Sequence, residues 1–281
     1  MKNYTTKQLS EVFKAAETTL FEQSSLTQSQ FKSALLPFKK INFQEKEDND
    51  FFWVMVYVTF YSGFKAKTVT DKIPAIKRIF GNYKEVAKFD DEKIQKIIDS
   101  KTIIGHKLKI QGIIHNAIEI KAIIKKFGSF KIYLDSFGYP NDDDVLFSLV
   151  KDLKKRFKYL GGITVFHFLT DIGFNVLKPD RVLCRICFRL GLVDSEDDLL
   201  GVIKAGRKIA AATKQPIRYI DIILVAYGQV DEKKEFGLKY GICLSVNPKC
   251  ELCGMYDFCI YKGKKNYITA INYQRDYKFV T

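Results

Sequence analysis

The chain has 281 residues, of which 47% are hydrophobic, so it can bury one large core or two smaller ones. Its 46 Lys and Arg residues exceed its 32 Asp and Glu residues, and the resulting formal charge of +14 favours a polyanionic partner, with nucleic acid ahead of an anionic membrane. The apolar runs fall short of the ~20 residues that span a bilayer, and the N-terminus lacks a signal-peptide core, so we expect a soluble, cytoplasmic protein.

Helical spacing dominates the first half of the chain. An amphipathic helix is predicted over residues 6–22, and the polar run QEKEDND at 44–50 marks a boundary. The apolar run FFWVMVYVTFY at 51–61 could be a strand, but its continuation into helical spacing favours a buried helix. Further helices are predicted at 65–71, 92–99 and 106–126.

The second half of the chain begins with a predicted hairpin of two helices. A first helix is expected at 147–158, a glycine turn at Leu160-Gly161-Gly162, and a second helix at 164–171. Asp180 then follows a proline at the start of the next helix. Later helices are predicted at 181–190, 195–205 and 217–227. Because no segment alternates with period two for long, the sequence predicts an almost entirely α protein.

The hairpin suggests a place where a phosphate could bind. A glycine turn before a helix leaves backbone N–H groups unpaired, and the helix dipole favours negative charge there. A carboxylate such as Asp180 beside a bound nucleic-acid backbone suggests chemistry on a sugar or a base. The simpler interpretation is an ordinary turn and an ordinary carboxylate at a helix start.

Four of the six cysteines lie close together, at Cys243, Cys250, Cys253 and Cys259. Disulfides are not expected without an export signal, so the thiolates should meet at one centre, either zinc or a cubane iron–sulfur cluster. The spacing has a single two-residue knuckle, which favours the cluster. Cys184 and Cys187 form a second Cys-x-x-Cys, but no other pair accompanies them and we interpret them as core thiols.

Taken together, these residues resemble the helix-hairpin-helix DNA glycosylases of base-excision repair. The cysteine spacing is similar to the four-iron loop of the endonuclease III and adenine glycosylase branch. Tyr159–Gly162 and KPDRVLCRI at 178–186 resemble the hairpin and catalytic-aspartate segment of that superfamily. The segment from Phe89 to Phe130 resembles 3-methyladenine DNA glycosylase type I.

The resemblance implies an all-α, two-domain helix-hairpin-helix glycosylase fold with a C-terminal iron–sulfur loop. Residues 48–174 would form the six-helix domain, and residues 1–47 with 175–281 the cluster domain. The implied cofactor is a 4Fe-4S cluster bound by the four clustered cysteines. The implied partner is double-stranded DNA that contains a damaged base. The protein is expected to bind it as a monomer and not to associate with a membrane.

The resemblance also implies roles for individual residues. Asp180 matches the aspartate that stabilises the developing sugar cation and positions or activates water. Leu160 and Gly162 match the hairpin amides that hold a phosphate, and Gly63 and Phe64 lie in the turn that matches the wedge, with Phe64 as the plug. We also expect Lys249, in the cluster loop, and the nearby Lys262, Lys264 and Lys265 to contact the DNA backbone. Candidates for the base pocket are Trp53, Tyr57, Phe60, Tyr61 and His167, although each could simply be a core aromatic.

Departures from the family pattern narrow the expected chemistry. Bifunctional members place a nucleophilic lysine just after the hairpin, where this chain has Ile163 and Thr164, so AP-lyase activity should be absent or weak. The glutamate and tryptophan used by 3-methyladenine glycosylase type I correspond to Val58 and Ala66. Our leading hypothesis is a monofunctional glycosylase for N-alkylpurines such as 3-methyladenine. The alternatives are a glycosylase for uracil, mismatched or oxidised bases, and a non-catalytic DNA-binding module.

Overall fold

The computed structural model describes residues 2–138 and 142–261, and within them the regular secondary structure is helical. Extended pairing in these ranges is limited to an isolated antiparallel bridge between Lys233 and Leu238. The prediction of an all-α protein is therefore confirmed. The chain divides into two compact units, which we call unit 1 (Met1–Lys40 with Leu177–Thr281) and unit 2 (Ile41–Val176). The predicted limits of the six-helix domain, residues 48 and 174, lie seven and two residues from those of unit 2.

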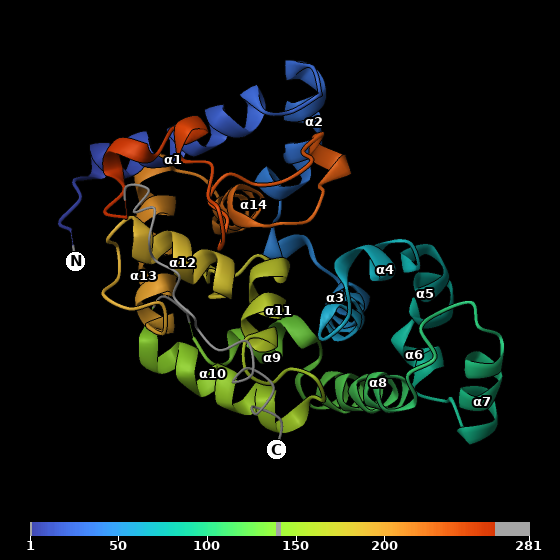
Figure 1. Cartoon of the computed structure of the whole chain (residues 1–281). Helices are drawn as coiled ribbons and strands as arrows, with labels where there is room; N and C mark the ends of the chain where they lie inside the picture. The colour runs from blue at the N-terminus through green and yellow to red at the C-terminus, as the bar shows by residue number, and fades with distance from the viewer. Residues whose placement is uncertain (1, 139–141, 262–281) are drawn as a thin grey trace. The chain divides into compact units, whose positions relative to one another are not determined.

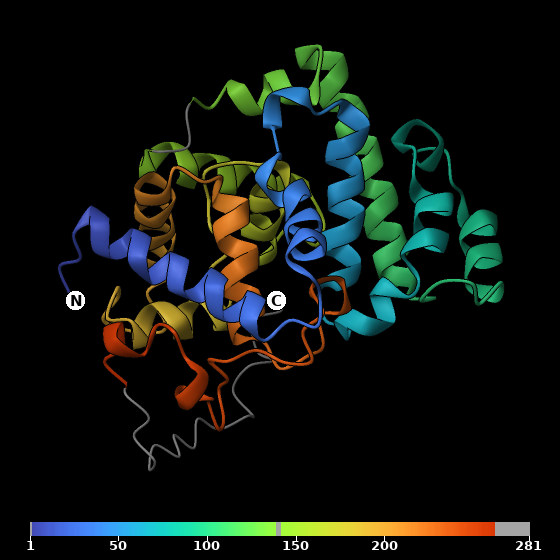
Figure 2. The same ribbon diagram turned by 90° about the horizontal axis from the view of Figure 1, so that it is seen from above.

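Unit 2 is built around α3 (Asp48–Tyr61), which packs against α8 (Lys107–Phe127) and α11 (Thr164–Ile172). The pairing of α3 with α8 is visible in both views (Figures 1 and 2). The remaining elements of this unit are η1 (Phe43–Glu45), α4 (Ala66–Thr70), α5 (Ile73–Phe80), α6 (Tyr83–Val86), α7 (Asp91–Asp99), α9 (Phe130–Asp135) and α10 (Asp143–Arg156).

The apolar run at 51–61 is a helix, as predicted. Side chains are buried around nearly its whole circumference, which explains why the run is apolar throughout. Phe51, Phe52, Met55, Val56, Val58 and Phe60 are all fully buried. The helix starts three residues before the apolar run, since Glu47 and Asp50 form a capping box at its N-terminus. Phe130 of α9 packs on Phe51, so the centre of unit 2 is rich in aromatic side chains.

Unit 1 is built around α14 (Ile217–Gly228), which packs against helices from both ends of the chain. Capping boxes start the two N-terminal helices, with Thr5 and Gln8 at the first and Thr27 and Gln30 at the second. The other elements of this unit are α1 (Thr6–Glu22), α2 (Gln28–Lys39), α12 (Arg181–Arg189), α13 (Leu199–Thr213), η2 (Lys234–Phe236), η3 (Cys250–Leu252) and η4 (Tyr256–Phe258).

Helix α13 differs from its prediction at both ends. The helix was expected at 195–205 but spans Leu199–Thr213. Its start is fixed by Asp198, whose side chain accepts a hydrogen bond from the Gly201 amide at 2.8 Å. Its end is fixed by Lys214, which adopts a left-handed conformation with φ of +55°.

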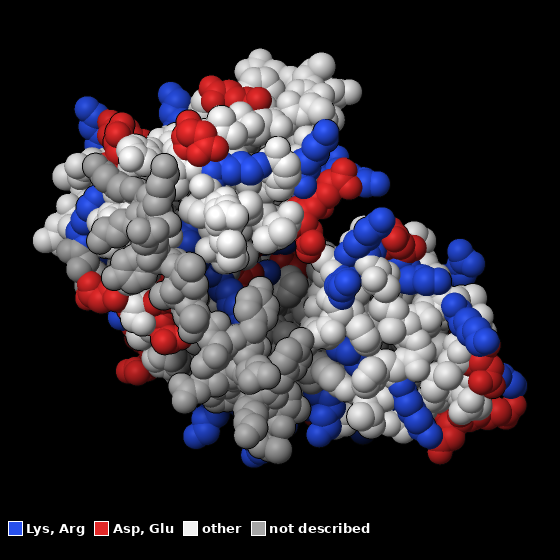
Figure 3. Space-filling view, in the orientation of Figure 1, with Lys and Arg blue, Asp and Glu red and all other residues white. Residues whose placement is uncertain are grey.

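None of the described helices is both long enough and apolar enough to cross a bilayer. Lys and Arg side chains are scattered over the face seen in Figure 3, with Asp and Glu side chains between them. The positive charge on this face is therefore dispersed rather than gathered into a single patch.

Candidate functional site

The turn after α3 carries the predicted wedge. Ser62 caps the C-terminus of α3. Gly63 has a φ of +78°, a backbone conformation that residues other than glycine rarely adopt. The ring of Phe64 packs edge-on against His106, with 5.9 Å between the ring centroids. Phe64 is only half-buried, so the turn presents part of an aromatic ring at the surface of unit 2.

Three of the five predicted pocket residues lie together in unit 2. The rings of Tyr57 and Tyr61, one turn apart on α3, have centroids 4.3 Å apart, and His167 of α11 lies 6.2 Å from Tyr57. The Nε2 atom of His167 is 3.2 Å from Oδ2 of Asp171, one turn further along α11. This cluster therefore combines two aromatic faces with a histidine–carboxylate pair.

The other two predicted pocket residues have different surroundings. Phe60 has no exposed surface and packs on Phe80, 6.0 Å away between ring centroids. A base cannot stack on a fully buried ring, so the assignment of Phe60 to an open pocket is wrong and the residue belongs to the core. Trp53 is half-buried, and the ammonium of Lys77 lies 5.5 Å from its ring centroid.

The hairpin between α10 and α11 is an open backbone corner. Tyr159 has a φ of +63° and Gly162 a φ of +50°. The amide of Thr164 donates to the Gly161 carbonyl at 3.0 Å, which closes the turn. Among the hydrogen bonds of the described residues, the amides of 160–163 donate to no acceptor, and a Cβ added at Gly161 or Gly162 would meet nothing within 4 Å. Leu160 is fully buried, whereas Gly161 and Gly162 are exposed. The unpaired amides of the two glycines suit an anion, and the phosphate role of Leu160 and Gly162 stays a prediction.

Helix α8 fixes the entry to this hairpin. The side chain of Asn116 is buried and forms two hydrogen bonds with the Lys158 backbone, donating to its carbonyl at 2.9 Å and accepting from its amide at 2.8 Å. The ring of Tyr159 lies directly over Gly112, where an added Cβ would come within 2.7 Å of ring atoms. A glycine at 112 is therefore required for the hairpin to pack on α8.

Replacing Gly112 with alanine should therefore lower the free energy of unfolding by about 1–3 kcal/mol, because the new methyl group overlaps the Tyr159 ring. Urea unfolding followed by circular dichroism measures this change. Gly161→Ala is the matched control, since open space surrounds that position and the change should stay within about 1 kcal/mol. Equal stability losses in the two variants would contradict the packing described for Tyr159.

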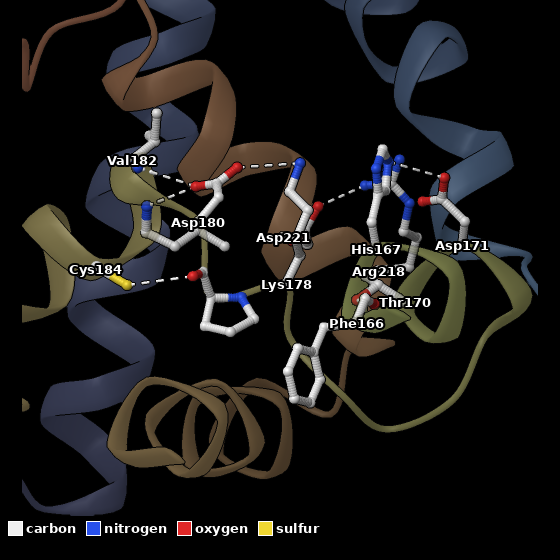
Figure 4. A network of polar contacts seen from close by, with 12 residues as sticks. Phe166, His167, Thr170, Asp171, Lys178, Asp180, Val182, Cys184, Arg218 and Asp221 are labelled. Atoms are coloured by element: carbon white, nitrogen blue, oxygen red, sulfur yellow. Dashed lines mark hydrogen bonds and ion pairs between the residues drawn. The ribbon is translucent and has the colours of Figure 1, made fainter. Parts of the chain in front are cut away.

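Asp180 is the N-cap of α12 in unit 1. Its Oδ1 atom accepts hydrogen bonds from the amides of Val182 at 3.0 Å and Leu183 at 3.1 Å (Figure 4). Its Oδ2 atom lies 3.0 Å from Nζ of Lys178. The helix start thus fixes the carboxylate, as the simpler interpretation expects, but one oxygen also has a specific cation. The catalytic role of Asp180 stays a prediction.

Lys178 is held between two carboxylates of unit 1. Burial lowers the pKa of its ammonium, but the charges of Asp180 and Asp221 outweigh this effect, so the pKa lies above its ordinary value. Asp221 is itself buried and pairs with Arg218 at 2.6 Å. Lys178 is therefore a protonated partner of Asp180 rather than a free amine.

The four clustered cysteines line one small cavity in unit 1, together with Arg189 and Tyr256 among others. None of the four forms a disulfide. Donors already point at two of the sulfurs: Arg189 Nη1 lies 3.3 Å from Sγ of Cys243, and Tyr227 Oη lies 3.2 Å from Sγ of Cys253. Donors of this kind stabilise thiolate charge, as expected around sulfur ligands.

The spacing of these thiols bears on what they could hold. Among the described residues, no three His, Cys, Asp or Glu side chains are grouped closely enough to ligate a single metal ion. A zinc site would bring all its sulfurs to ~2.3 Å from one ion, whereas in a cubane cluster each thiolate binds a different iron. The assignment of a 4Fe-4S cluster to Cys243, Cys250, Cys253 and Cys259 stays a prediction.

The remaining cysteines and Lys249 have clear structural surroundings. Cys184 and Cys187 are buried in the core of unit 1, and burial raises the pKa of each thiol to about 12, which suits the expected core thiols. The ammonium of Lys249 lies over the ring of Tyr240, 2.6 Å from its centroid, so it already has a protein partner. Lys262, Lys264 and Lys265, also expected near DNA, lie outside the described residues.

A sequence profile described as methyladenine glycosylase matches residues 42–181, just under half of the chain. The match covers nearly all of unit 2 and ends one residue after Asp180. Residues 42–181, which we call the methyladenine glycosylase segment, are similar to that family. The predicted resemblance is confirmed, and with it the enzyme class, a DNA glycosylase that hydrolyses N-glycosidic bonds. The methyladenine glycosylase segment contains the wedge turn, the hairpin and Asp180, whereas the cysteine loop lies beyond it.

Solved structures of DNA glycosylases are also similar to the chain. A 3-methyladenine DNA glycosylase I in complex with 3-methyladenine shares 26% identity over 46% of this chain and 82% of its own, with a TM-score of 0.38. The Staphylococcus aureus enzyme of that name shares 25% identity over 47% and 80%, with a TM-score of 0.40. The 8-oxoguanine DNA glycosylase of Thermotoga maritima shares 20% identity over 77% and 95%, with a TM-score of 0.48. All three scores lie below 0.5, so the family match alone carries the assignment.

Sequence reasoning missed several residues that support the methyladenine glycosylase segment and the cysteine loop. Lys178 stands two residues before Asp180, and that proximity was a usable signal for an ion pair. Asn116 interrupts the apolar face of α8, which indicates a buried polar side chain that needs a partner. Arg185 and Arg189, one turn apart on α12, both form hydrogen bonds with Cys243. No local sequence pattern predicts those contacts.

Proposed function

We propose that the protein is a monofunctional DNA glycosylase that releases N-alkylated purines, with 3-methyladenine as the first substrate, and that Asp180 assists the hydrolysis. The observation that carries this proposal is the continuous family match from residue 42 to residue 181, which joins the hairpin to Asp180. The open amides of the hairpin and the aromatic cluster at Tyr57 support it independently.

The first requirement is access to the base. A base stacked in duplex DNA cannot be reached, so the enzyme must extrude it and fill the gap. The half-buried Phe64 on its glycine turn is suited to fill that gap, and unpaired amides near Gly162 are suited to hold a backbone phosphate. Both features are found in unit 2.

An alkylated purine that carries a positive charge is attracted to aromatic faces. Tyr57 and Tyr61 provide two such faces in contact with each other, and His167 with Asp171 borders them. We therefore assign the base pocket to this cluster, without Phe60. The pocket would select a cationic base by charge and stacking rather than by many hydrogen bonds.

Hydrolysis of a cationic base needs little help with the leaving group. The C1′–N bond breaks with its electron pair going to the purine, which leaves as a neutral base. Water adds to C1′ and gives up one proton. The Asp180 carboxylate, held by two amides and Lys178, would stabilise the developing positive charge on the sugar and orient that water.

No amine is available for covalent catalysis at the expected place. The positions after the hairpin are Ile163 and Thr164, and Lys178 has a raised pKa that keeps it protonated. We therefore expect no Schiff base with the sugar and no strand cleavage by the enzyme itself.

The cysteine loop is proposed to hold a 4Fe-4S cluster through Cys243, Cys250, Cys253 and Cys259. Such a cluster would cross-link the loop and stabilise its fold, and it would take no part in a redox step. Arg189 and Tyr227 would donate to two of the ligating sulfurs, as they already do to the thiols. Arg185, which donates to the Cys243 carbonyl at 3.2 Å, would anchor the loop to α12.

The purified protein is expected to release 3-methyladenine from methylated duplex DNA, with strand breaks appearing only after alkali. Mass spectrometry identifies the free bases, and gel analysis before and after alkali separates base release from strand cleavage. Borohydride should trap no covalent complex, because Ile163 and Thr164 occupy the positions after the hairpin and Lys178 is protonated. Release of uracil or oxidised bases instead would change the substrate, and tight binding without any release would favour a DNA-binding module.

A further inference from the structure

Lys109 is a buried lysine whose position the proposed mechanism does not yet use. Its side chain lies on α8, is 5% exposed and has no carboxylate partner among the described residues. Burying an unpaired ammonium is unfavourable, and an apolar side chain of similar length would avoid that penalty. Its surroundings therefore need to provide compensating interactions.

Those interactions come from the end of α3. The Nζ atom donates to the carbonyl of Ser62 at 2.6 Å and also to the carbonyl of Thr59. Carbonyl groups in the last turn of a helix lack intrahelical donors and lie at the negative end of the helix dipole. Lys109 thus satisfies them with its hydrogen bonds and its charge, and it fixes the backbone from which Gly63 and Phe64 project.

The same ammonium also faces two aromatic rings. It lies 5.1 Å from the ring centroid of Phe64 and 4.7 Å from that of Tyr159. Phe64 belongs to the wedge turn, whereas Tyr159 lies in the hairpin and is held over Gly112 of the same α8 helix. Cation–π attraction in a buried site is strong enough to orient both rings.

We propose that Lys109 is a positioning residue that sets the wedge turn against the DNA-binding hairpin, so that Phe64 can enter the duplex while the hairpin holds the backbone. This inference rests on the proposed function, because it assumes that Phe64 fills the gap left by an extruded base. Helix α8 is the rigid element, with Lys109 holding the wedge turn and Gly112 and Asn116 holding the hairpin.

The charge of Lys109 makes this role sensitive to pH. Burial lowers its pKa to about 8, and the other titratable groups that face the cluster are His106 at the start of α8 and Tyr159 of the hairpin. Burial raises the pKa of Tyr159, so that phenol stays neutral as Lys109 loses its proton. Above pH 8 the neutral amine binds the two carbonyls and the two rings less strongly, so wedge insertion should weaken.

The test uses the full-length protein and a duplex with a tetrahydrofuran abasic nucleotide opposite 2-aminopurine, whose fluorescence reports insertion into the gap. Lys109→Met should reduce the fluorescence change about tenfold or more at pH 7, because hydrogen bonds from a charged group are lost. Its affinity for undamaged duplex should stay within about threefold. Lys121→Met, which removes an exposed lysine from the same helix, is the matched control and should respond as the wild type does.

Two further measurements keep the test decisive. Phe64→Ala should abolish the signal with Lys109 intact, and the wild-type signal should fall as pH rises through about 8, which requires no substitution. Lys109→Gln serves if the methionine variant does not fold. A full signal from a folded Lys109 variant, or a flat wild-type pH profile, overturns the role of Lys109 while base release by the wild type still supports the proposed function. No signal from the wild type overturns the wedge assignment and this inference with it.

Discussion

Replacing Asp180 with asparagine should slow release of the alkylated base by about 10²–10³-fold, because the carboxylate charge that stabilises the sugar cation is lost. Asparagine is as good an N-cap as aspartate, so the bonds from Val182 and Leu183 can persist and α12 should stay folded. Single-turnover assays on DNA with a 3-methyladenine analogue give the rate. Affinity for undamaged duplex should change by no more than about threefold, since the site is not a phosphate contact.

The control for this prediction is Asp198→Asn. Asp198 caps α13 of the same unit with one hydrogen bond to an amide, at 2.8 Å from Gly201. The Asp198→Asn variant tests whether the loss of a capping charge is enough to impair the enzyme. Its rate of base release should match that of the wild type. If Asp180→Asn retained full activity, the assigned role of Asp180 would be wrong. If both variants lost activity equally, the effect would be one of stability.

Replacing Cys250 with serine should give a colourless protein with little iron, whereas the wild type should be brown and contain about four irons per chain. The cysteine loop of unit 1 lacks long helices, so we expect the loss of its cross-link to lower the midpoint of thermal unfolding as well. Elemental analysis, the visible spectrum and a thermal melt measure the three effects.

The matched control is Cys184→Ala, which removes a buried thiol outside the cysteine loop. This variant should keep its colour and iron and lose only the packing of one small side chain. If the wild type were colourless and contained one zinc per chain, the cysteines would form a zinc site and the cluster assignment would be wrong. A stable, colourless and fully active Cys250→Ser variant would show that the loop does not depend on a cluster.

Local patterns predicted the helices, the glycine hairpin and the position of Asp180 because each depends on neighbouring residues. The burial of Phe60 could not be predicted in this way. Helix α3 is apolar on every side, so helical periodicity does not distinguish its core face from a pocket face. Tyr57, Tyr61 and Phe60 look alike in the sequence, and only packing against Phe80 and His167 separates them.

The role of Lys109 could not be predicted from local sequence patterns either. In the sequence it is one lysine among many in a basic chain, two residues from the exposed Lys107. Its acceptors are backbone carbonyls near Ser62, far away in the sequence and without any side-chain signature. Interactions with backbone atoms of a distant helix leave no trace in residue type, so such a contact requires the structure.

The interrupted course of unit 1 has a consequence for how the chain folds during synthesis. Unit 2 is one continuous segment, so all of its residues have been made once residue 176 leaves the ribosome. Helix α1 packs against α13 and α14, which are made much later, so its apolar face must wait for partners while unit 2 can already be complete. We expect unit 2 to fold first in the nascent chain, and α1 to be the segment most exposed to chaperones until the end of synthesis.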